Sequence, residues 1–174
     1  MEVSLGNIFV ISDTHFGHEN ILNFTDKTTG ARVRPFYGVR HMNEHMVDRW
    51  NSVVKPGDKV YHLGDVFFGS KDAFEKLWPR LNGSKRLVVG NHDDVKYLSS
   101  GGFFKKVMLW RKFDSLLLTH VPVHPSTLGE SRFSGKEVIN IHGHIHTNKS
   151  PQGNYKCVCV EQIDYTPVAL EELY

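Results

Sequence analysis

Aspartate, asparagine and histidine residues recur at the ends of short apolar stretches, and they are the residues of this sequence best suited to chemistry. Residues 8–11 read Ile-Phe-Val-Ile, which is typical of a buried strand, and Asp13 and His15 follow directly. A carboxylate and an imidazole two positions apart at a strand end can both point at one place beyond the sheet. In open α/β sheets, binding sites form in that crevice.

Four further apolar stretches end in the same way. They run into Asp65 after residues 60–63, into Asn91, His92 and Asp93 after 86–89, into His120 after 116–119, and into His142, His144 and His146 after 138–141. Packing alone does not explain five strand-like stretches that all end in such side chains. The glycines that precede Asp65, Asn91 and His144 indicate tight turns in which the backbone approaches a site.

The order of these blocks, D-x-H, G-D, G-N-H-D, a lone His and G-H-x-H, resembles the calcineurin-like metallophosphoesterase superfamily. The longer string D-T-H-F-G-H resembles a compact bacterial and phage subgroup, and the resemblance runs from the first strand to the end of the chain. It implies an α/β (α+β) fold, a four-layer αββα sandwich of two mixed sheets flanked by helices. We expect residues 1–174 to form a single metallophosphoesterase domain.

The resemblance also implies a centre that binds two divalent metal ions. Its pattern assigns Asp13, His15 and His146 to the first metal, Asn91, His120 and His144 to the second, and a bridging position to Asp65. Two such cations lower the pKa of a shared water and bind the phosphoryl oxygens as charge builds. Mixed nitrogen and oxygen ligands favour manganese, with iron, zinc, nickel or cobalt as alternatives that the sequence does not separate.

His92 directly follows the asparagine of this pattern. By similarity to the family, it hydrogen-bonds the substrate and protonates the leaving oxygen. Asp93 is expected to orient His92 by accepting a hydrogen bond from its other ring nitrogen.

Several other polar residues stay open to two interpretations. His18 could extend the first metal site or touch substrate, and His62 could support the site or be a core histidine, whereas His142 is interpreted as structural. Arg34, Arg40 and Arg132 could bind a substrate phosphate in a bidentate manner. The alternative is that they are solvated loop arginines, and for Arg34 we favour this alternative.

These residues together predict a metal-dependent phosphoesterase in which a metal-bridging hydroxide attacks phosphorus and His92 assists the leaving group. Phosphodiesters derived from nucleotides or nucleic acid are the favoured substrates, because 174 residues leave little chain for a lid and an open site admits substituted phosphates. A phosphomonoesterase of nucleotides or phosphoproteins is the alternative. An interaction module that binds metal with little catalysis is the alternative from another class, although a scaffold has no need of His92.

The composition, 40% hydrophobic and 23% charged, is that of an ordinary soluble globular protein. The formal net charge of +2 does not argue for nucleic acid or a membrane surface as a partner. The sequence has no apolar stretch of about 18 residues, and its first residues lack the basic and apolar regions of a signal peptide. We therefore expect a cytoplasmic protein with no membrane partner, and its oligomeric state stays open.

Apolar spacing predicts the remaining elements. Residues 41–54 and 70–81 have helical spacing, with Ser70 as the N-cap and Pro79 tightening the last turn of the second helix. A short helix is expected over 95–98, and strands over 107–111, 155–163 and 168–173. Cys157 and Cys159 lie in the predicted strand 155–163 and are expected to be small hydrophobic residues in the core.

Overall fold

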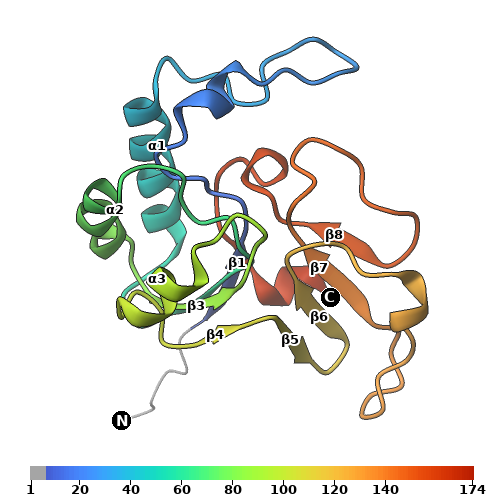
Figure 1. Ribbon diagram of the computed structural model, residues 1–174. Helices are drawn as coiled ribbons and strands as arrows, with labels where there is room; N and C mark the ends of the chain where they lie inside the picture. The colour runs from blue at the N-terminus through green and yellow to red at the C-terminus, as the bar shows by residue number, and fades with distance from the viewer. Residues whose placement is uncertain (1–6) are drawn as a thin grey trace.

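The computed structural model describes residues 7–174, so the prediction that residues 1–6 do not begin a signal peptide lies outside the described residues. Within this range the chain forms two mixed β-sheets that face each other, and the labelled α-helices lie on the outer side of one of them (Figure 1). This arrangement confirms the predicted α/β fold of two mixed sheets. No helix in the described range is long and apolar enough to cross a bilayer.

The first sheet has the strand order β4-β3-β2-β1-β9. Its strands are β1 Ile8–Ile11, β2 Lys59–His62, β3 Ser84–Val88, β4 Val107–Met108 and β9 Val168–Ala169. β1 to β4 run parallel, and β9 is antiparallel to β1. The C-terminal ends of β1, β2 and β3 therefore meet at one edge of the sheet, which is where the predicted site residues follow in sequence.

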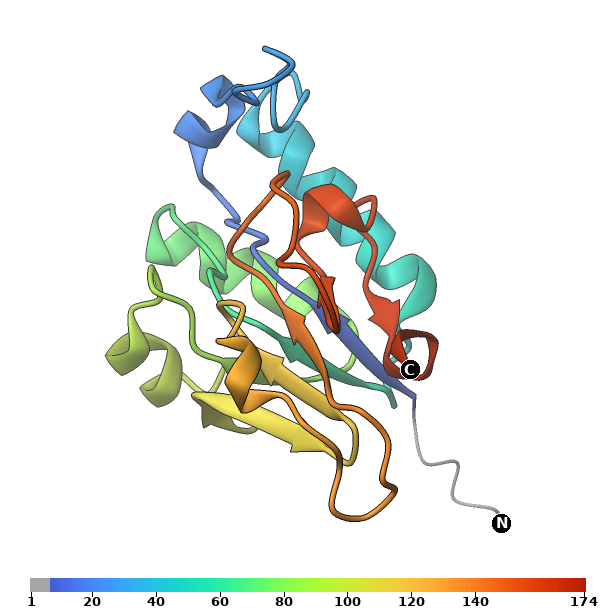
Figure 2. The same ribbon diagram turned by 90° about the vertical axis from the view of Figure 1, so that its right-hand side faces the viewer.

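The second sheet has the strand order β5-β6-β7-β8. Its strands are β5 Trp110–Phe113, β6 Leu116–Thr119, β7 Ile139–His142 and β8 Tyr155–Cys157. β5 is antiparallel to β6, and β6, β7 and β8 run parallel. The loops around residues 24–33 and 129–136 project at opposite ends of the molecule (Figure 2).

Helix α1 spans Val39–Val53, α2 spans Lys71–Leu77 and α3 spans Val95–Ser100. The predicted N-cap is confirmed, because the Ser70 side chain accepts a hydrogen bond from the backbone nitrogen of Ala73 at 3.1 Å. The chain tightens into a 3₁₀ turn, η2 (Trp78–Arg80), at the predicted proline. The predicted helices are thus confirmed, with α1 beginning two residues earlier than expected.

Alternate residues of the first sheet enter two apolar cores. Phe9 and Ile11 of β1 pack with the helices, whereas Val10 packs between the sheets with Leu116 and Ile141. This alternation is what a strand that is buried on both faces requires. Both cores hold β1 firmly and thereby fix the position of the residues that follow it.

Three predicted strands were drawn too long. The predicted strand 107–111 is divided at Leu109, because β4 pairs with β3 in the first sheet and β5 pairs with β6 in the second. β8 ends at Cys157, because the chain then crosses to the end of β1, where Ser12 bonds to Val158 and Val160, and a 3₁₀ turn, η4 (Val160–Gln162), follows. Only Val168–Ala169 of the predicted strand 168–173 pairs, and the buried residues Leu170 and Leu173 lie in a 3₁₀ turn, η5 (Leu170–Leu173).

Candidate active site at the strand ends

The residues that follow the strands form two clusters. Asp13, His15 and His146 form the first cluster, and Asp65, His120 and His144 form the second. In each cluster, one ligand-capable atom from every member lies within 4.8 Å of the others. The structure therefore brings together six of the seven residues that the sequence assigned to metals, in the two predicted groups.

Asp65 lies between the two clusters. Its Oδ2 atom is 3.6 Å from Nε2 of His15 and 3.5 Å from Nε2 of His120. Asn91 completes the second cluster, because its Oδ1 atom lies 2.8 Å from His120 Nε2. One carboxylate that faces imidazoles of both groups has the position expected of a bridging residue.

Five residues of these clusters have left-handed backbone conformations that side-chain-bearing residues rarely adopt. They are Asp13, His15, Asp65, His144 and His146, with φ between 46° and 72°. Backbone strain of this kind costs on the order of 1–3 kcal/mol per residue and persists where the surrounding structure enforces it, often at functional sites. The fold thus tolerates backbone strain at the residues that form the two clusters.

Glycine is required where the turns of the site touch. A Cβ atom on Gly64 would lie 2.4 Å from the backbone nitrogen of Gly90, and one on Gly143 would lie 2.0 Å from Ser12 Oγ. Neither position has room for a side chain, so the predicted close approach of the backbone is confirmed.

Arg34 holds the backbone of the first cluster in place. The guanidinium is fully buried and donates from Nη1 to the carbonyl of Thr14 at 2.7 Å and from Nη2 to the carbonyl of Asp13 at 2.5 Å. Its Nε donates to Glu161 Oε1 at 2.7 Å. The favoured interpretation of Arg34 as a solvated residue is therefore wrong, and its buried position also excludes direct contact with a substrate phosphate.

Glu161, which the sequence analysis missed, joins Arg34 to the first cluster. Its Oε1 atom lies 2.9 Å from Nδ1 of His146, so one carboxylate holds both the guanidinium and the imidazole. Burial raises the pKa of Glu161, but the charge of Arg34 and the contact with His146 outweigh it and lower the pKa. An ionised carboxylate behind a histidine fixes the ring orientation, as in many metal sites.

The atoms of Asp13 suggest what the first cluster binds. Oδ2 accepts hydrogen bonds from Ser12 Oγ at 2.6 Å, from the backbone nitrogen of His144 at 2.8 Å and from Cys159 Sγ at 3.3 Å. Oδ1 is buried and, in the described part of the chain, has no partner, and the same holds for His15 Nε2, 3.8 Å away. A buried polar atom without a partner costs about 1–3 kcal/mol. A cation between these two atoms would satisfy both.

Charge also fits a cation at this place. Burial raises the pKa of Asp13, but contact with His15 and the charges of His120 and His146 prevail and keep the pKa well below its usual range. In the second cluster, burial followed by the charge of His120 lowers the pKa of His144. For His146, burial lowers the pKa, but the hydrogen bond and charge of Glu161 outweigh it and raise the pKa. Asp13 and His144 therefore favour the forms that bind metals, an ionised carboxylate and a neutral imidazole.

Cys159 has a role that the sequence did not predict. It is buried, as expected, but its thiol donates to Asp13 Oδ2, so it is more than a small hydrophobic residue. Cys157 is only half-buried at the end of β8.

Asp93 does not have the role expected of it. Its carboxylate accepts hydrogen bonds from the backbone nitrogens of Gly90 at 2.7 Å, Val66 at 2.9 Å and Asp65 at 3.1 Å. Within residues 7–174, none of its hydrogen bonds goes to His92. Asp93 therefore holds the turns after β2 and β3 together, and the expectation that it orients the His92 ring is wrong.

His92 is exposed at the mouth of the site. Its backbone nitrogen donates to Asp65 Oδ1 at 3.0 Å, which keeps the residue beside the clusters. Its ring centroid lies 6.1 Å from that of His15 and 5.2 Å from that of Phe68. The His18 ring stacks on the Phe68 ring, and their centroids are 4.6 Å apart. Phe68 is half exposed, and the sequence analysis missed it, although an aromatic residue shortly after the G-D block was a signal.

The residues whose roles the sequence did not decide lie in different surroundings. His18 Nδ1 accepts from the backbone nitrogen of Ile21 and caps a 3₁₀ turn, η1 (Glu19–Asn23). His62 is fully buried with Nε2 2.9 Å from Thr14 Oγ1, and burial lowers its pKa to about 3. His142 contacts Gly143 and Ser150, as a structural histidine would. Arg40 and Arg132 are exposed.

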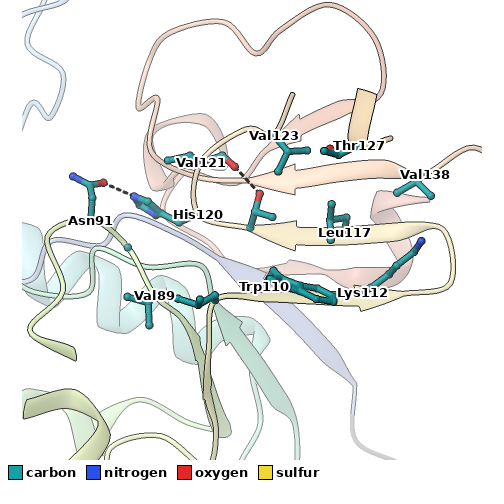
Figure 3. Close-up of a pocket in the computed structure, with 13 residues that line it drawn as sticks. Val89, Asn91, Trp110, Lys112, Leu117, His120, Val121, Val123, Thr127 and Val138 are labelled. Carbon is teal, nitrogen blue, oxygen red and sulfur yellow. Dashed lines mark hydrogen bonds between the residues drawn. The ribbon is translucent and has the colours of Figure 1, made fainter. Parts of the chain in front are cut away.

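Each cluster borders a cavity of its own. A groove of about 710 Å³ begins at Asn91 and His120 of the second group and continues along β5 and β6 (Figure 3). A smaller cavity of about 330 Å³ is lined by His146 of the first cluster together with residues from 21–33 and 147–148. The site is therefore open on more than one side.

Comparison with known proteins agrees with this geometry. The family model of the calcineurin-like phosphoesterase superfamily domain matches residues 7–160. An uncharacterized protein of Methanocaldococcus jannaschii is 34% identical, covering 97% of this chain and 90% of its own. The gene 66 proteins of two Mycobacterium phages are 27% and 26% identical over 82% of this chain and 80% and 79% of theirs.

A solved structure extends the agreement to the fold. The crystal structure of a protein of unknown function from Aquifex aeolicus has 30% sequence identity to this chain, with a TM-score of 0.69 over 97% of each chain. The family match over most of the chain, together with two clusters able to bind metal, leads to one conclusion. This chain belongs to the calcineurin-like phosphoesterase superfamily and is a metal-dependent phosphoesterase.

Proposed function

We propose that this protein hydrolyses phosphodiesters, including esters derived from nucleotides, with two divalent cations bound at the strand ends. The observation that carries the proposal is the pair of cavities beside the two clusters. A phosphodiester has two substituents on phosphorus, and each cavity can receive one of them. A monoester has one substituent and would need only one cavity.

Asp13, His15 and His146 would hold the first cation, Asn91, His120 and His144 the second, and Asp65 would contact both. Oδ1 of Asp13 and Nε2 of His15, which have no hydrogen-bond partner among residues 7–174, support this assignment. The bound cations would activate a water and withdraw negative charge from the phosphoryl oxygens. Nitrogen and oxygen donors suit manganese first, with iron, zinc, nickel or cobalt as alternatives.

The side chains of the protein supply the rest of the chemistry. His92 is exposed beside Asp65, so its imidazole can reach a bound ester and donate a proton to the departing oxygen. Phe68 and His18 form an aromatic wall next to it. Arg34, Glu161 and Asp93 do not reach the substrate, and they hold the backbone and rings of the clusters in place.

A matched pair of chromogenic substrates tests the proposal. Protein loaded with manganese is assayed on bis(4-nitrophenyl) phosphate, a diester, and on 4-nitrophenyl phosphate, a monoester with the same leaving group. We expect kcat/KM for the diester to be at least about tenfold higher, a difference near 1.4 kcal/mol in transition-state binding.

Two outcomes would contradict the proposal. A preference for the monoester would favour the phosphomonoesterase. Tight binding of two manganese ions without turnover of either substrate would favour the interaction module.

A further inference from the structure

The groove beside the second cluster has a property that hydrolysis of a diester alone does not require. It is lined mainly by apolar side chains and contains a large exposed aromatic residue, Trp110. We infer that this groove binds a flat aromatic ring, such as a nucleobase, on the ester arm that stays attached to phosphorus. The inference rests on the proposed function, since it places the phosphate between the two clusters.

The groove lies on the outer face of the second sheet. Figure 3 shows Trp110 and Lys112 on β5 and Leu117 on β6 as its floor, with Val121 and Val123 from the segment after β6 above them. In the sheet register Lys112 lies opposite Leu117, so these side chains belong to one continuous surface. The floor is rigid because the other face of β6 is packed in the core.

The walls of the groove offer apolar contact and little hydrogen bonding. Thr119, a polar residue of the lining, already donates to the carbonyl of Val121 and accepts from Asn140 Nδ2 at 2.9 Å. Asn91 and His120 occupy one end, where the phosphate would lie, and Lys112 lies farther along (Figure 3). A ligand here is therefore best matched by a flat ring that stacks on the floor and needs few hydrogen bonds from the walls, with an anionic group at the end near the clusters.

Trp110 gives the groove its preference for a flat ring. Its side chain is 60% exposed. Leaving a large indole in water forfeits the free energy of burying its area. A nucleobase stacked on such a ring is stabilised, and this stabilisation depends little on which base it is.

The positions of His92 and the groove decide which arm of the ester enters. His92, the proposed proton donor to the leaving oxygen, is near His15 and Phe68 and does not line the groove. The leaving arm therefore points toward His92 and Phe68, and the His18 ring, which packs against both Phe68 and Phe24, joins this side to the smaller cavity. The arm that stays on phosphorus points past Asn91 and His120 into the groove.

The size of the groove agrees with a small ligand. About 710 Å³ falls within the roughly 300–1,000 Å³ of small-molecule sites. The groove is also continuous with the second cluster, so a bound phosphate must direct a substituent to its entrance. This continuity favours part of the substrate over a second copy of the chain as the occupant.

Two esters with one leaving group test the inference. Thymidine 5′-(4-nitrophenyl phosphate) and methyl 4-nitrophenyl phosphate differ only in the arm that stays on phosphorus. We expect wild-type protein to prefer the thymidine ester, and Trp110→Ala to lower the ratio of the two kcat/KM values at least tenfold. Trp110→Phe should keep most of the preference. Phe133→Ala removes another aromatic residue, 93% exposed and outside the groove, and should not change the ratio.

Binding measured by calorimetry separates failure of this inference from failure of the proposed function. Thymidine 5′-phosphate should bind manganese-loaded protein at least tenfold more tightly than methyl phosphate, and Trp110→Ala should remove that difference even if no ester is hydrolysed. Hydrolysis of both esters with no thymidine preference in the wild type would overturn the inference alone. The inference would also be overturned if Trp110→Ala lost kcat/KM equally on both esters and light scattering showed a wild-type dimer that dissociates in the variant. The groove would then be an interface between copies of the chain.

Discussion

The two clusters share Asp65, but the fold holds them in different ways. In the first, Asp13 and His15 are buried, and the Arg34–Glu161 pair lies directly behind them. In the second, His144 and Asn91 are exposed. His120 is fixed through its Nδ1 atom, 2.7 Å from the carbonyl of Leu63, and its other nitrogen faces Asn91 at the entrance of the groove.

The first cluster is therefore the side of the site that the fold holds fixed, and the second is the side that is open to the substrate. Breaking a buried charged pair costs about 3–5 kcal/mol, so the residues behind the first cluster are not free to move. The exposed members of the second cluster have no comparable buried partner in the described part of the chain. We expect the first cluster to keep its geometry without a ligand and the second to adjust when substrate enters the groove.

The largest effect should come from the residue that both clusters share. Asp65→Asn removes the charge that faces His15 and His120, so two cations would repel each other without compensation. We expect a loss in kcat/KM on the order of 1000-fold, because two-metal sites supply several kcal/mol of transition-state stabilisation. Steady-state kinetics and metal analysis measure both consequences.

Asp48→Asn, an exposed carboxylate on α1, is the matched control and should keep full activity. Thermal unfolding should show that Asp65→Asn still folds. Wild-type activity of Asp65→Asn at saturating manganese would remove the basis for treating the two clusters as one site.

A second, smaller effect should leave both clusters intact. His92→Ala removes a ring that belongs to neither cluster, so both metals should still bind. We expect kcat to fall about 100-fold on esters with poor leaving groups, because the departing oxygen loses its proton donor. The loss should shrink with nitrophenolate, which leaves without a proton, and equal losses on both kinds of ester would instead mean that His92 positions the phosphate.

The different support of the two clusters also explains what the sequence could predict. Asp13, Asp65 and Asn91 follow strands directly, and parallel strands bring their ends to one edge, so local pattern and topology were enough to group them. Arg34 and Glu161 are 127 residues apart and meet only because the chain after β8 crosses to the end of β1. No local sequence pattern predicts that crossing.

The errors in the strands have a similar origin. Residues 107–111 have the apolar content of one strand, and only the approach of the second sheet divides them at Leu109. Asp93 was assigned to its neighbour in sequence, His92, whereas a carboxylate in a turn commonly accepts backbone hydrogen bonds, as it does here. Being adjacent in sequence therefore did not indicate that the Asp93 and His92 side chains are in contact.

The third prediction separates the clusters from each other. Glu161→Gln keeps the size of the side chain but removes the charge that holds Arg34 and His146. We expect one of the two metals to bind about 10–100-fold more weakly, the usual cost of losing the group behind a metal-binding histidine, and the other to bind as before. The free energy of unfolding should fall by about 3 kcal/mol.

Stepwise titration of metal-free protein with manganese, followed by calorimetry, resolves the two sites. Glu171→Gln changes an exposed glutamate of η5 and should leave both affinities unaltered. Equal weakening of both sites would mean that the clusters are not supported separately.

The smallest effect concerns His62, the buried imidazole that contacts Thr14, which lies between Asp13 and His15 of the first cluster. Burial lowers its pKa from 6.5 to about 3. Between these two pH values the unfolded chain binds a proton at His62 that the folded chain does not bind. The free energy of unfolding therefore falls as pH drops below 6.5, by up to about 1.4 kcal/mol per pH unit from this residue.

His62→Gln should remove this contribution. The variant should be less stable than wild type near pH 7, by about 1 kcal/mol, because the contact with Thr14 is weakened. Its stability should then decline more gently toward pH 4.5, so the two urea-unfolding curves converge as acid is added to metal-free protein. His41→Gln, on the exposed side of α1, should keep the wild-type slope. Parallel slopes for His62→Gln and wild type would show that His62 takes up its proton in the folded state. The structure around His62 would then be more open than its burial indicates.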